Sequence, residues 1–412
     1  PATSEFYIYD ESADQWTDVS ATSAAYPGPP RSFGYGVVLP ELNSTKAYLG
    51  FGAALDGQRL SDLWELDMAT LEWRKLPNLP DNHGRRHPAM NVVRNADTGK
   101  FEIHVGLGDT FTNGRFVNLN DFWKFDIESK TWSRLPDLPG APRHHPFYFG
   151  IGSQSFAGFG HSPYGIERDW YALKSDSSID PSWTVESSMA SYEVQVHDDG
   201  SALYSNEPVT KEARVAGAQF SIELPLKGGE SNLEGSLGFV LSGDGDNHGP
   251  MEEGQFHAFY PARNELLEGP EGTSSSWWRQ LPPHPGYSRW APGSFVMRGT
   301  ARAYFTGGYD RALRILFSDL WMIDLSGLFH SYDGEQDFQV EIEEVTGNNG
   351  TNAVGDMENQ DESSASFTPA VLESESSASP AMLTSSSGRI NRCMMTTSVA
   401  LWTSLLYFLS NV

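Results

Sequence analysis

Five arginines recur at the starts of similar segments of this chain, and their chemistry is the first feature that suggests a site. A guanidinium offers a planar fork of hydrogen-bond donors, so several of them around one opening could hold a carboxylate, a sulfate or a phosphate. We therefore predict a pocket for an anionic ligand such as an acidic sugar. The five arginines are Arg31, Arg86, Arg143, Arg214 and Arg289.

Histidine and tryptophan side chains accompany these arginines. His87, His144 and Trp290 directly follow them, and His145 comes one position later. We add these four residues to the predicted ligand-binding set. The alternative is structural, because an acid recurs with the same period and could pair with each arginine inside the fold. The recurring acids are Asp62, Asp121, Asp169 and Asp319.

Motifs for metals, cofactors and common catalytic centres are missing from the sequence. The segment Asp244-Gly-Asp-Asn-His248 has the start of a calcium loop but lacks the later acidic ligand, so a turn is the simpler interpretation. The chain contains no His-Glu-x-x-His, no Gly-x-Ser-x-Gly and no Gly-Lys-Ser/Thr loop. Its single cysteine is Cys393, near the C-terminus. We predict no cofactor, no metal and no catalytic residue.

The elements that must position these residues repeat in a fixed order. Each arginine precedes a run that ends in glycine, such as Tyr48-Leu-Gly-Phe-Gly52. A strand with aspartate and aromatic residues follows, such as Asp121-Phe-Trp-Lys-Phe-Asp126, and then a tryptophan strand that ends before proline. Alternating apolar residues indicate strands, and the repeat length of roughly fifty residues indicates one four-stranded blade per repeat.

These motifs together resemble kelch repeats, which form β-propellers, over residues 1 to about 326. The resemblance implies an all-β fold for residues 1–330, with an insertion near 187–211. Five repeats are complete. The segment from Phe6 to Trp16 matches the outer half of another, so we predict six four-stranded blades. The inner half of this incomplete repeat is expected to lie upstream, or a late strand such as Phe338–Ile342 helps to close the ring.

Kelch propellers host unrelated activities, so the resemblance alone does not assign a function. It implies that Cys393 is too remote for the copper chemistry of galactose oxidase, which needs a cysteine crosslinked to a tyrosine. Other kelch enzymes, such as sialic acid mutarotases, use acid, base and arginine groups at the channel. A sugar isomerase or epimerase is therefore the alternative to a non-catalytic binding protein.

The C-terminal part has a different composition. Residues 331–388 contain many acids but no Lys or Arg, which predicts a disordered stalk. Residues 389–412 then predict a membrane anchor or a GPI-attachment signal, with Ser386, Ser387 or Gly388 as the attachment residue. Asn43 and Asn349 are predicted glycosylation sites. The chain begins with Pro1, so we expect a removed signal or a fragment.

The net charge of −26 makes nucleic acid and anionic lipid poor partners for the propeller. We predict a non-catalytic propeller on the extracellular face of the plasma membrane, which recognises a protein or a carbohydrate. Its rigid ring would present variable loops to that ligand.

Overall fold

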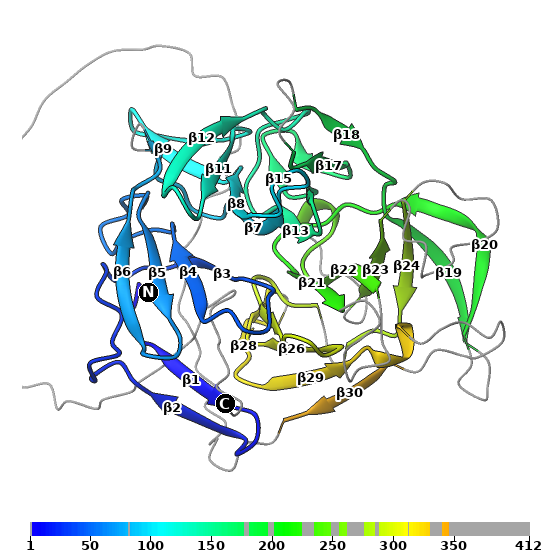
Figure 1. The fold of residues 1–412 in the computed structure, drawn as a ribbon. Coiled ribbons are helices and arrows are strands. Elements are labelled where there is room, and N and C mark those ends of the chain that lie inside the picture. Colours follow the sequence, from blue (N-terminus) through cyan, green and yellow to red (C-terminus); the bar gives the residue numbers. More distant parts are fainter. Residues whose placement is uncertain are drawn as a thin grey trace, which may run out of the picture.

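The computed structural model of the chain is an all-β ring with almost no helix (Figure 1). It describes residues 2–80, 83–176, 181–196, 202–224, 235–248, 255–261, 276–284, 288–311, 313–329 and 340–345.

Five four-stranded antiparallel sheets form the blades of a β-propeller. In each blade the first strand lies nearest the centre and the last lies outermost (Figure 1). The prediction of four short strands per repeat is thus confirmed.

Blade 1 contains β3 (Tyr35–Val38), β4 (Lys46–Gly50), β5 (Leu63–Asp67) and β6 (Glu72–Leu76). Blade 2 contains β7 (Ala89–Arg94), β8 (Phe101–Gly106), β11 (Phe122–Asp126) and β12 (Thr131–Leu135). Blade 3 contains β13 (Phe147–Ile151), β14 (Gln154–Gly158), β17 (Trp170–Lys174) and β18 (Trp183–Val185). Blade 4 contains β21 (Ala218–Leu224), β22 (Gly235–Leu241), β23 (Phe256–Tyr260) and β24 (Trp277–Leu281). Blade 5 contains β25 (Gly293–Val296), β26 (Arg302–Thr306), β29 (Leu320–Asp324) and β30 (Glu341–Glu344).

The N-terminal hairpin of β1 (Tyr7–Asp10) and β2 (Gln15–Asp18) has the register of the outer half of a blade. Tyr9 lies opposite Trp16, as Leu66 lies opposite Trp73 in blade 1. The hairpin fills the wide outer gap between blades 1 and 5, with Phe6 packed on the first and Tyr9 on the second.

The number of blades therefore differs from the prediction. The described residues form five four-stranded blades and one outer half, and not six complete blades. At the inner end of the gap, the Arg298 guanidinium donates directly to the carbonyl oxygens of Leu39, Glu41 and Ser44, at 3.3, 2.5 and 2.7 Å. Blades 1 and 5 thus contact each other directly at the inner end of this gap.

The late strand has a different role from the predicted one. β30 pairs with β29, with Ile342 opposite Ile323, and so it completes blade 5. The propeller therefore extends beyond residue 330 to at least Val345. This corrects the predicted disorder of residues 331–388 for the short segment 340–345, whose Ile342 packs against the core of blades 4 and 5.

In blades 1 to 4 a tryptophan of the outer strand donates a hydrogen bond to the segment before that blade. The indole nitrogens of Trp132 and Trp278 donate to the carbonyl oxygens of Pro77 and Ser187, at 2.9 and 2.8 Å. Trp73 makes the equivalent bond to Ala24 at 3.0 Å, which ties blade 1 to the loop after the N-terminal hairpin. These recurring tryptophans therefore hold neighbouring blades together and help to close the ring.

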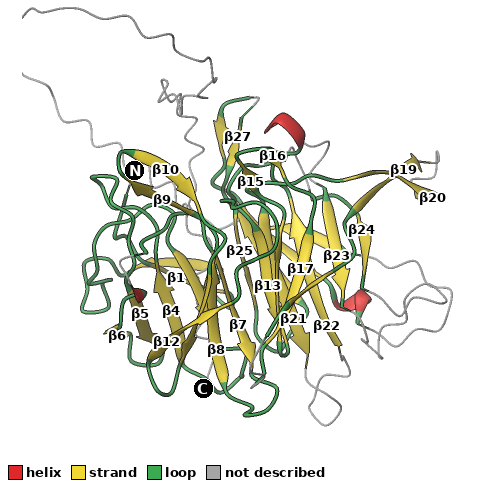
Figure 2. Ribbon diagram, turned by 90° about the horizontal axis from the view of Figure 1, so that it is seen from above, coloured by secondary structure: helices red, strands yellow, loops and turns green. Residues whose placement is uncertain are grey.

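Loops gather at the two ends of the ring. Antiparallel order places the connections between second and third strands at one end, together with the segments that enter each blade. We call this end the loop face. Small hairpins rise from it in Figure 2. They are β9 (Asp109–Thr112) with β10 (Arg115–Asn118), β15 (His161–Ser162) with β16 (Gly165–Ile166), and β27 (Tyr309–Asp310) with β28 (Ile315–Leu316).

The predicted insertion near 187–211 is also a hairpin. It consists of β19 (Ala190–Val196) and β20 (Ala202–Lys211), and it projects away from the ring (Figure 1).

Several predicted features lie outside the described residues. They are Asn349, Ser386, Ser387, Gly388 and the tail 389–412. Within the part of the chain that the structure describes, no helix has the length and apolar character needed to cross a membrane.

Candidate functional site

Four of the five recurring arginines are buried and paired within the blades. Arg31 forms a two-pronged pair with Asp62 at 3.0 and 2.6 Å, and Arg289 does so with Asp319 at 2.6 and 2.7 Å. Arg143 pairs with Asp169 in the same way. The structure thus shows the arginine–aspartate pairing that the shared period had suggested as the alternative. A ligand-binding role for this set remains a prediction.

The second member of the set needs a correction. Arg85, and not Arg86, occupies the position equivalent to the other arginines. Its guanidinium is buried and bonds both oxygens of Asp121, at 2.9 and 2.8 Å. Burial alone would raise the pKa of Asp121, but the adjacent Arg85 holds it at about 2. Two arginines stand side by side in this repeat, so spacing alone could not tell which one is buried.

Blade 4 departs from the pattern because its third strand lacks the aspartate. Arg214 bonds the carboxylate of Glu212 at 3.0 Å and the side-chain oxygen of Gln255 at 2.7 Å. Its guanidinium is also buried. A carboxylate from the entering segment thus neutralises the charge that an aspartate neutralises elsewhere.

The residues next to these arginines line a mouth at the centre of the loop face. In each blade, the residue after the buried arginine forms a β-bridge with the residue after a glycine of the second-to-third-strand loop. We define the mouth by these ten residues, which differ from blade to blade. The bridged pairs are Ser32 with Ala53, Arg86 with Asp109, His144 with His161, Val215 with Asp244 and Trp290 with Tyr309.

The predicted ligand-binding set contains three of the ten mouth residues, Arg86, His144 and Trp290. It lacks Asp109 and Asp244. A signal for these two was present, because each follows a glycine that ends a strand run, as Asp109 follows Gly108. Only the β-bridges show that the residues after these glycines lie opposite the residues that follow the buried arginines.

The next residue of each entering segment closes the mouth from below. These five residues are Phe33, His87, His145, Ala216 and Ala291, with φ between 50° and 54°. A left-handed backbone is uncommon outside glycine, and its recurrence in every blade indicates a turn that the fold imposes. Phe33, His145 and Trp290 pack edge to face with ring centroids 4.9 to 6.2 Å apart, so side chains from blades 1, 3 and 5 meet here.

Five histidines form a row across blades 2, 3 and 4. His87 stacks on His145 with ring centroids 3.4 Å apart, and His144 lies 5.2 Å from His145. His161 continues the row at 5.0 Å from His144, and His248 lies 4.8 Å beyond it. The predicted residues His87, His144 and His145 are therefore brought together.

Three histidines of the row, His87, His144 and His145, are uncharged near neutral pH. Burial, followed by the charge of Arg86, holds the pKa of His87 well below its ordinary value. Burial and the neighbouring His87 do the same for His145, and burial lowers the pKa of His144 to about 4. Neutral imidazoles can accept protons or hydrogen bonds from a ligand at the mouth.

Asp109 holds one side of the mouth together. Its carboxylate accepts from Arg59 at 2.8 Å and from Arg86 at 3.2 Å, and His87 Nδ1 lies 3.2 Å away. Arg86 is thus the one member of the predicted arginine set that reaches the mouth. Because Arg86 already pairs with Asp109, less of its positive charge is available to attract an anionic ligand.

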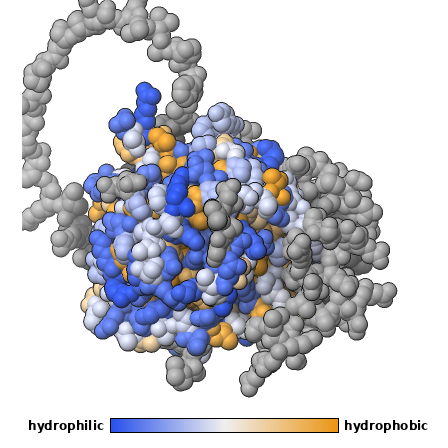
Figure 3. Space-filling model, turned by 45° about the horizontal axis from the view of Figure 1, so that its top comes forward, coloured by the Kyte–Doolittle hydropathy of each residue, from blue (hydrophilic) through white to orange (hydrophobic). Residues whose placement is uncertain are grey.

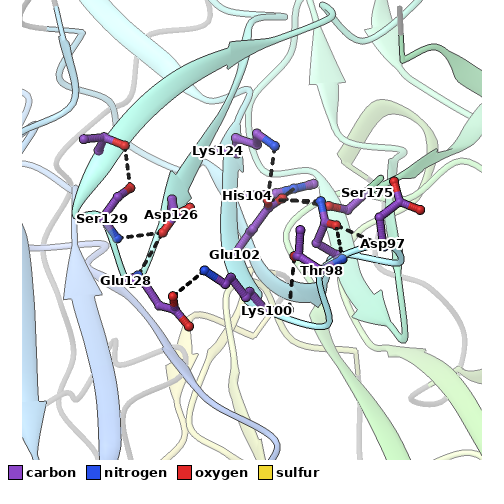
Figure 4. Close-up of polar contacts among 12 residues, drawn as sticks. Asp97, Thr98, Lys100, Glu102, His104, Lys124, Asp126, Glu128, Ser129 and Ser175 are labelled. Carbon is purple, nitrogen blue, oxygen red and sulfur yellow. Dashed lines mark hydrogen bonds and ion pairs between the residues drawn. The ribbon is translucent and has the colours of Figure 1, made fainter. Parts of the chain in front are cut away.

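A second polar cluster lies on blade 2, away from the mouth (Figure 4). Glu102 accepts from Lys124 at 3.1 Å and from Ser175 at 2.7 Å, with His104 at 3.5 Å. Burial opposes the charge, but these donors lower the pKa of Glu102 to about 2. Glu102 and His104 are buried, and Ser175 belongs to blade 3, so the cluster fastens two blades together.

A cavity of about 370 Å³ opens at the end opposite the mouth. Its walls come from the inner strands of all five blades and include Val37, Met90, Tyr148 and Val296. Asn43 lies exposed in the turn beside Leu42, which lines this cavity. Among the described residues no group of three or more histidines, cysteines or acids is arranged to hold a metal ion.

Comparisons with known proteins support the fold and nothing finer. No protein-family model matches the sequence, and no curated protein matches it either. A solved structure of the protein YjhT is similar, with a TM-score of 0.50 and 13% identity over 83% of this chain and 97% of that one. At this identity the similarity shows the β-propeller fold alone.

Proposed function

We propose that this protein is a non-catalytic binding propeller of the kelch type, which recognises a protein or carbohydrate ligand through its loop face. One observation carries the proposal. Seven exposed large apolar side chains lie in the loops between second and third strands of four blades, and Trp16, Leu42 and Val185 are the three others among the described residues. The seven are Leu55, Phe111, Phe116, Val117, Tyr164, Leu313 and Ile315.

Such clustering favours binding because apolar side chains gain free energy when a partner covers them. Tyr164 is 87% exposed and Leu55 is 74% exposed, so neither contributes to the core. In Figure 3 the apolar side chains form separate patches on a largely hydrophilic surface. Several small patches on one rigid face suit a partner that touches several loops at once.

The test is binding of the full-length protein to an array of neutral and acidic glycans and to defined peptides. We expect a ligand whose affinity falls at least tenfold when Tyr164 and Phe116 are both changed to serine. The matched control is Val185→Ser, because Val185 is equally apolar and exposed but lies on outer strand β18. An equal loss in the control would argue against the loop face.

We further propose presentation at the extracellular face of the plasma membrane, through the tail at 389–412. Support comes from the apolar end of the sequence and from the sequon at Asn43, which lies exposed in a turn. The test is surface labelling of cells that express the full chain, before and after treatment with a GPI-specific phospholipase. Retention inside the cell would contradict this part of the proposal.

A second candidate is a sugar isomerase or epimerase that acts through the mouth. The neutral side chains of His87, His144 and His145 favour it, because a neutral imidazole can act as a general base. Burial of Arg31, Arg143, Arg214 and Arg289 weakens it, because an acidic sugar needs exposed cations. The test is to incubate acidic sugars with the protein and to follow by NMR whether protons of the sugar ring exchange with solvent. Turnover that disappears in His144→Gln would favour the enzyme.

A further inference from the structure

Two hairpins on the loop face share a combination of side chains. The blade-2 tip consists of Phe111, Arg115, Phe116 and Val117, on β9 and β10. The blade-5 tip consists of Leu313, Arg314 and Ile315, at the turn into β28. In both, an exposed arginine stands between exposed apolar residues. Figure 2 shows β10 and β27 rising from the same end of the ring.

The blade-2 tip is held rigidly. Phe111 lies opposite Phe116 in the hairpin, with ring centroids 5.1 Å apart. Asn113 and Gly114 both have positive φ, as a two-residue hairpin turn of the I′ type requires. At its base, Asp109 bonds Arg59, whose guanidinium lies 5.3 Å from the Phe116 ring. A preorganised tip loses little conformational entropy when it binds.

The blade-5 tip is shorter but is also fixed at its base. The Asp310 carboxylate accepts from the backbone N–H of Leu313 at 2.8 Å, and Asp310 is buried. Ile315 lies opposite Asp310 in the hairpin, and Arg314 has a φ of 57°. This local bond orders the turn that presents Leu313 and Arg314.

The charge of the tips is opposite to that of the whole chain. The chain carries −26, yet both tips present a cation. Neither Arg115 nor Arg314 forms an ion pair with any residue that the structure describes. Acidic groups on a partner would form ion pairs with these two arginines, and the complementary charge would also speed the association of the two proteins.

The apolar part of the tips favours a protein over a sugar. Val117, Leu313 and Ile315 are aliphatic, so they cannot offer the flat ring on which a sugar stacks. They suit an apolar pocket on a protein, where buried anchors provide most of the binding energy.

We propose that the blade-2 and blade-5 tips dock together on a protein partner whose contact surface combines acidic and apolar side chains. This proposal rests on the loop-face binding proposed above and adds the chemical class of the partner.

The experiment selects from a displayed library of random peptides with the full-length protein, and then measures selected peptides by calorimetry. We expect peptides enriched in Asp or Glu next to large apolar residues, with affinity that falls as salt rises from about 0.05 to 0.5 M. The charge variant R115E/R314E should weaken binding at least tenfold, and so should the apolar variant F116S/I315S. Lys75→Glu on outer strand β6 and Val185→Ser on β18 are the matched controls.

Each result decides between the proposals. If the selected peptides are not acidic, or R115E/R314E binds them unchanged, the acidic partner is overturned, while a loss in F116S/I315S alone still supports the loop face. Binding to heparin in a parallel assay, without any acidic peptide, would overturn the protein partner in favour of an acidic glycan. If no peptide is selected and neither variant alters any binding, both proposals fail. Thermal unfolding of each variant confirms that it is folded.

Discussion

The imidazole rings of His87 and His145 lie face to face below the mouth, with centroids 3.4 Å apart and planes inclined by 26°. Two imidazoles at this separation are stable when both are neutral, because a proton on either would sit against its neighbour without water. Their surroundings include Asp109, Arg86 and His144, and burial dominates the pKa of both rings.

Acid should therefore destabilise the propeller through this pair. The pKa values of His87 and His145 in the folded protein lie below the unfolded value of about 6.5. The contribution of the two neutral rings to the free energy of unfolding is complete above that pH. It falls as the pH drops below it, by up to about 1.4 kcal/mol per pH unit for each histidine. Urea unfolding between pH 7.5 and 5 measures the slope. His145→Phe should reduce it, whereas an unchanged slope would place the titration elsewhere.

The two adjacent arginines of blade 2 should differ sharply in their effect on stability. Arg85→Ala leaves the buried Asp121 carboxylate without its main partner, which costs about 3–5 kcal/mol. Arg86→Ala leaves Asp109 bonded to Arg59 and should cost only about 1 kcal/mol. Urea unfolding of both variants at pH 7.5 provides the comparison. A larger loss for Arg86→Ala would reverse the assignment.

Glu102 should stabilise the contact between blades 2 and 3 (Figure 4). Its pKa is lowered to about 2, so its contribution is present above the unfolded value of about 4.3 and is lost as the pH falls toward 2. We expect Glu102→Gln to cost about 2–3 kcal/mol at pH 7. Glu128→Gln is the control, because its pair with Lys100 is exposed to solvent and should contribute little to stability. Equal effects would contradict this account.

Closure of the ring should depend on the bond from Trp73 to Ala24. Trp73→Phe keeps most of the packing but leaves the Ala24 carbonyl oxygen without that donor, at a cost of about 1 kcal/mol. Hydrogen exchange should accelerate over residues 6–26 more than elsewhere. Trp132→Phe removes the equivalent bond to Pro77, and its effect should appear between blades 1 and 2 instead. Uniform acceleration in both variants would contradict a local role.

The repeats were readable in the sequence because each blade needs the same local chemistry. Glycine-ended runs, Asp-aromatic strands and spaced tryptophans all lie where the structure places second, third and fourth strands. The incomplete repeat at Phe6–Trp16 was also recognised. The inner half was beyond sequence reasoning, because closure through Arg298 depends on contacts between residues more than 250 positions apart.

By itself, the sequence indicated the all-β fold, the four-stranded repeat and the aspartate partners of three arginines, Arg31, Arg143 and Arg289, because strand periodicity and Arg–Asp pairing are local and recur. Only the tertiary structure decided that Arg85 rather than Arg86 is buried, that β30 completes blade 5, and that Asp109 at the mouth lies beside a row of five histidines. The physical reason is that the ring brings together single residues from different blades, and the spacing between repeats carries no information about which side chain turns inward and which remains at the rim.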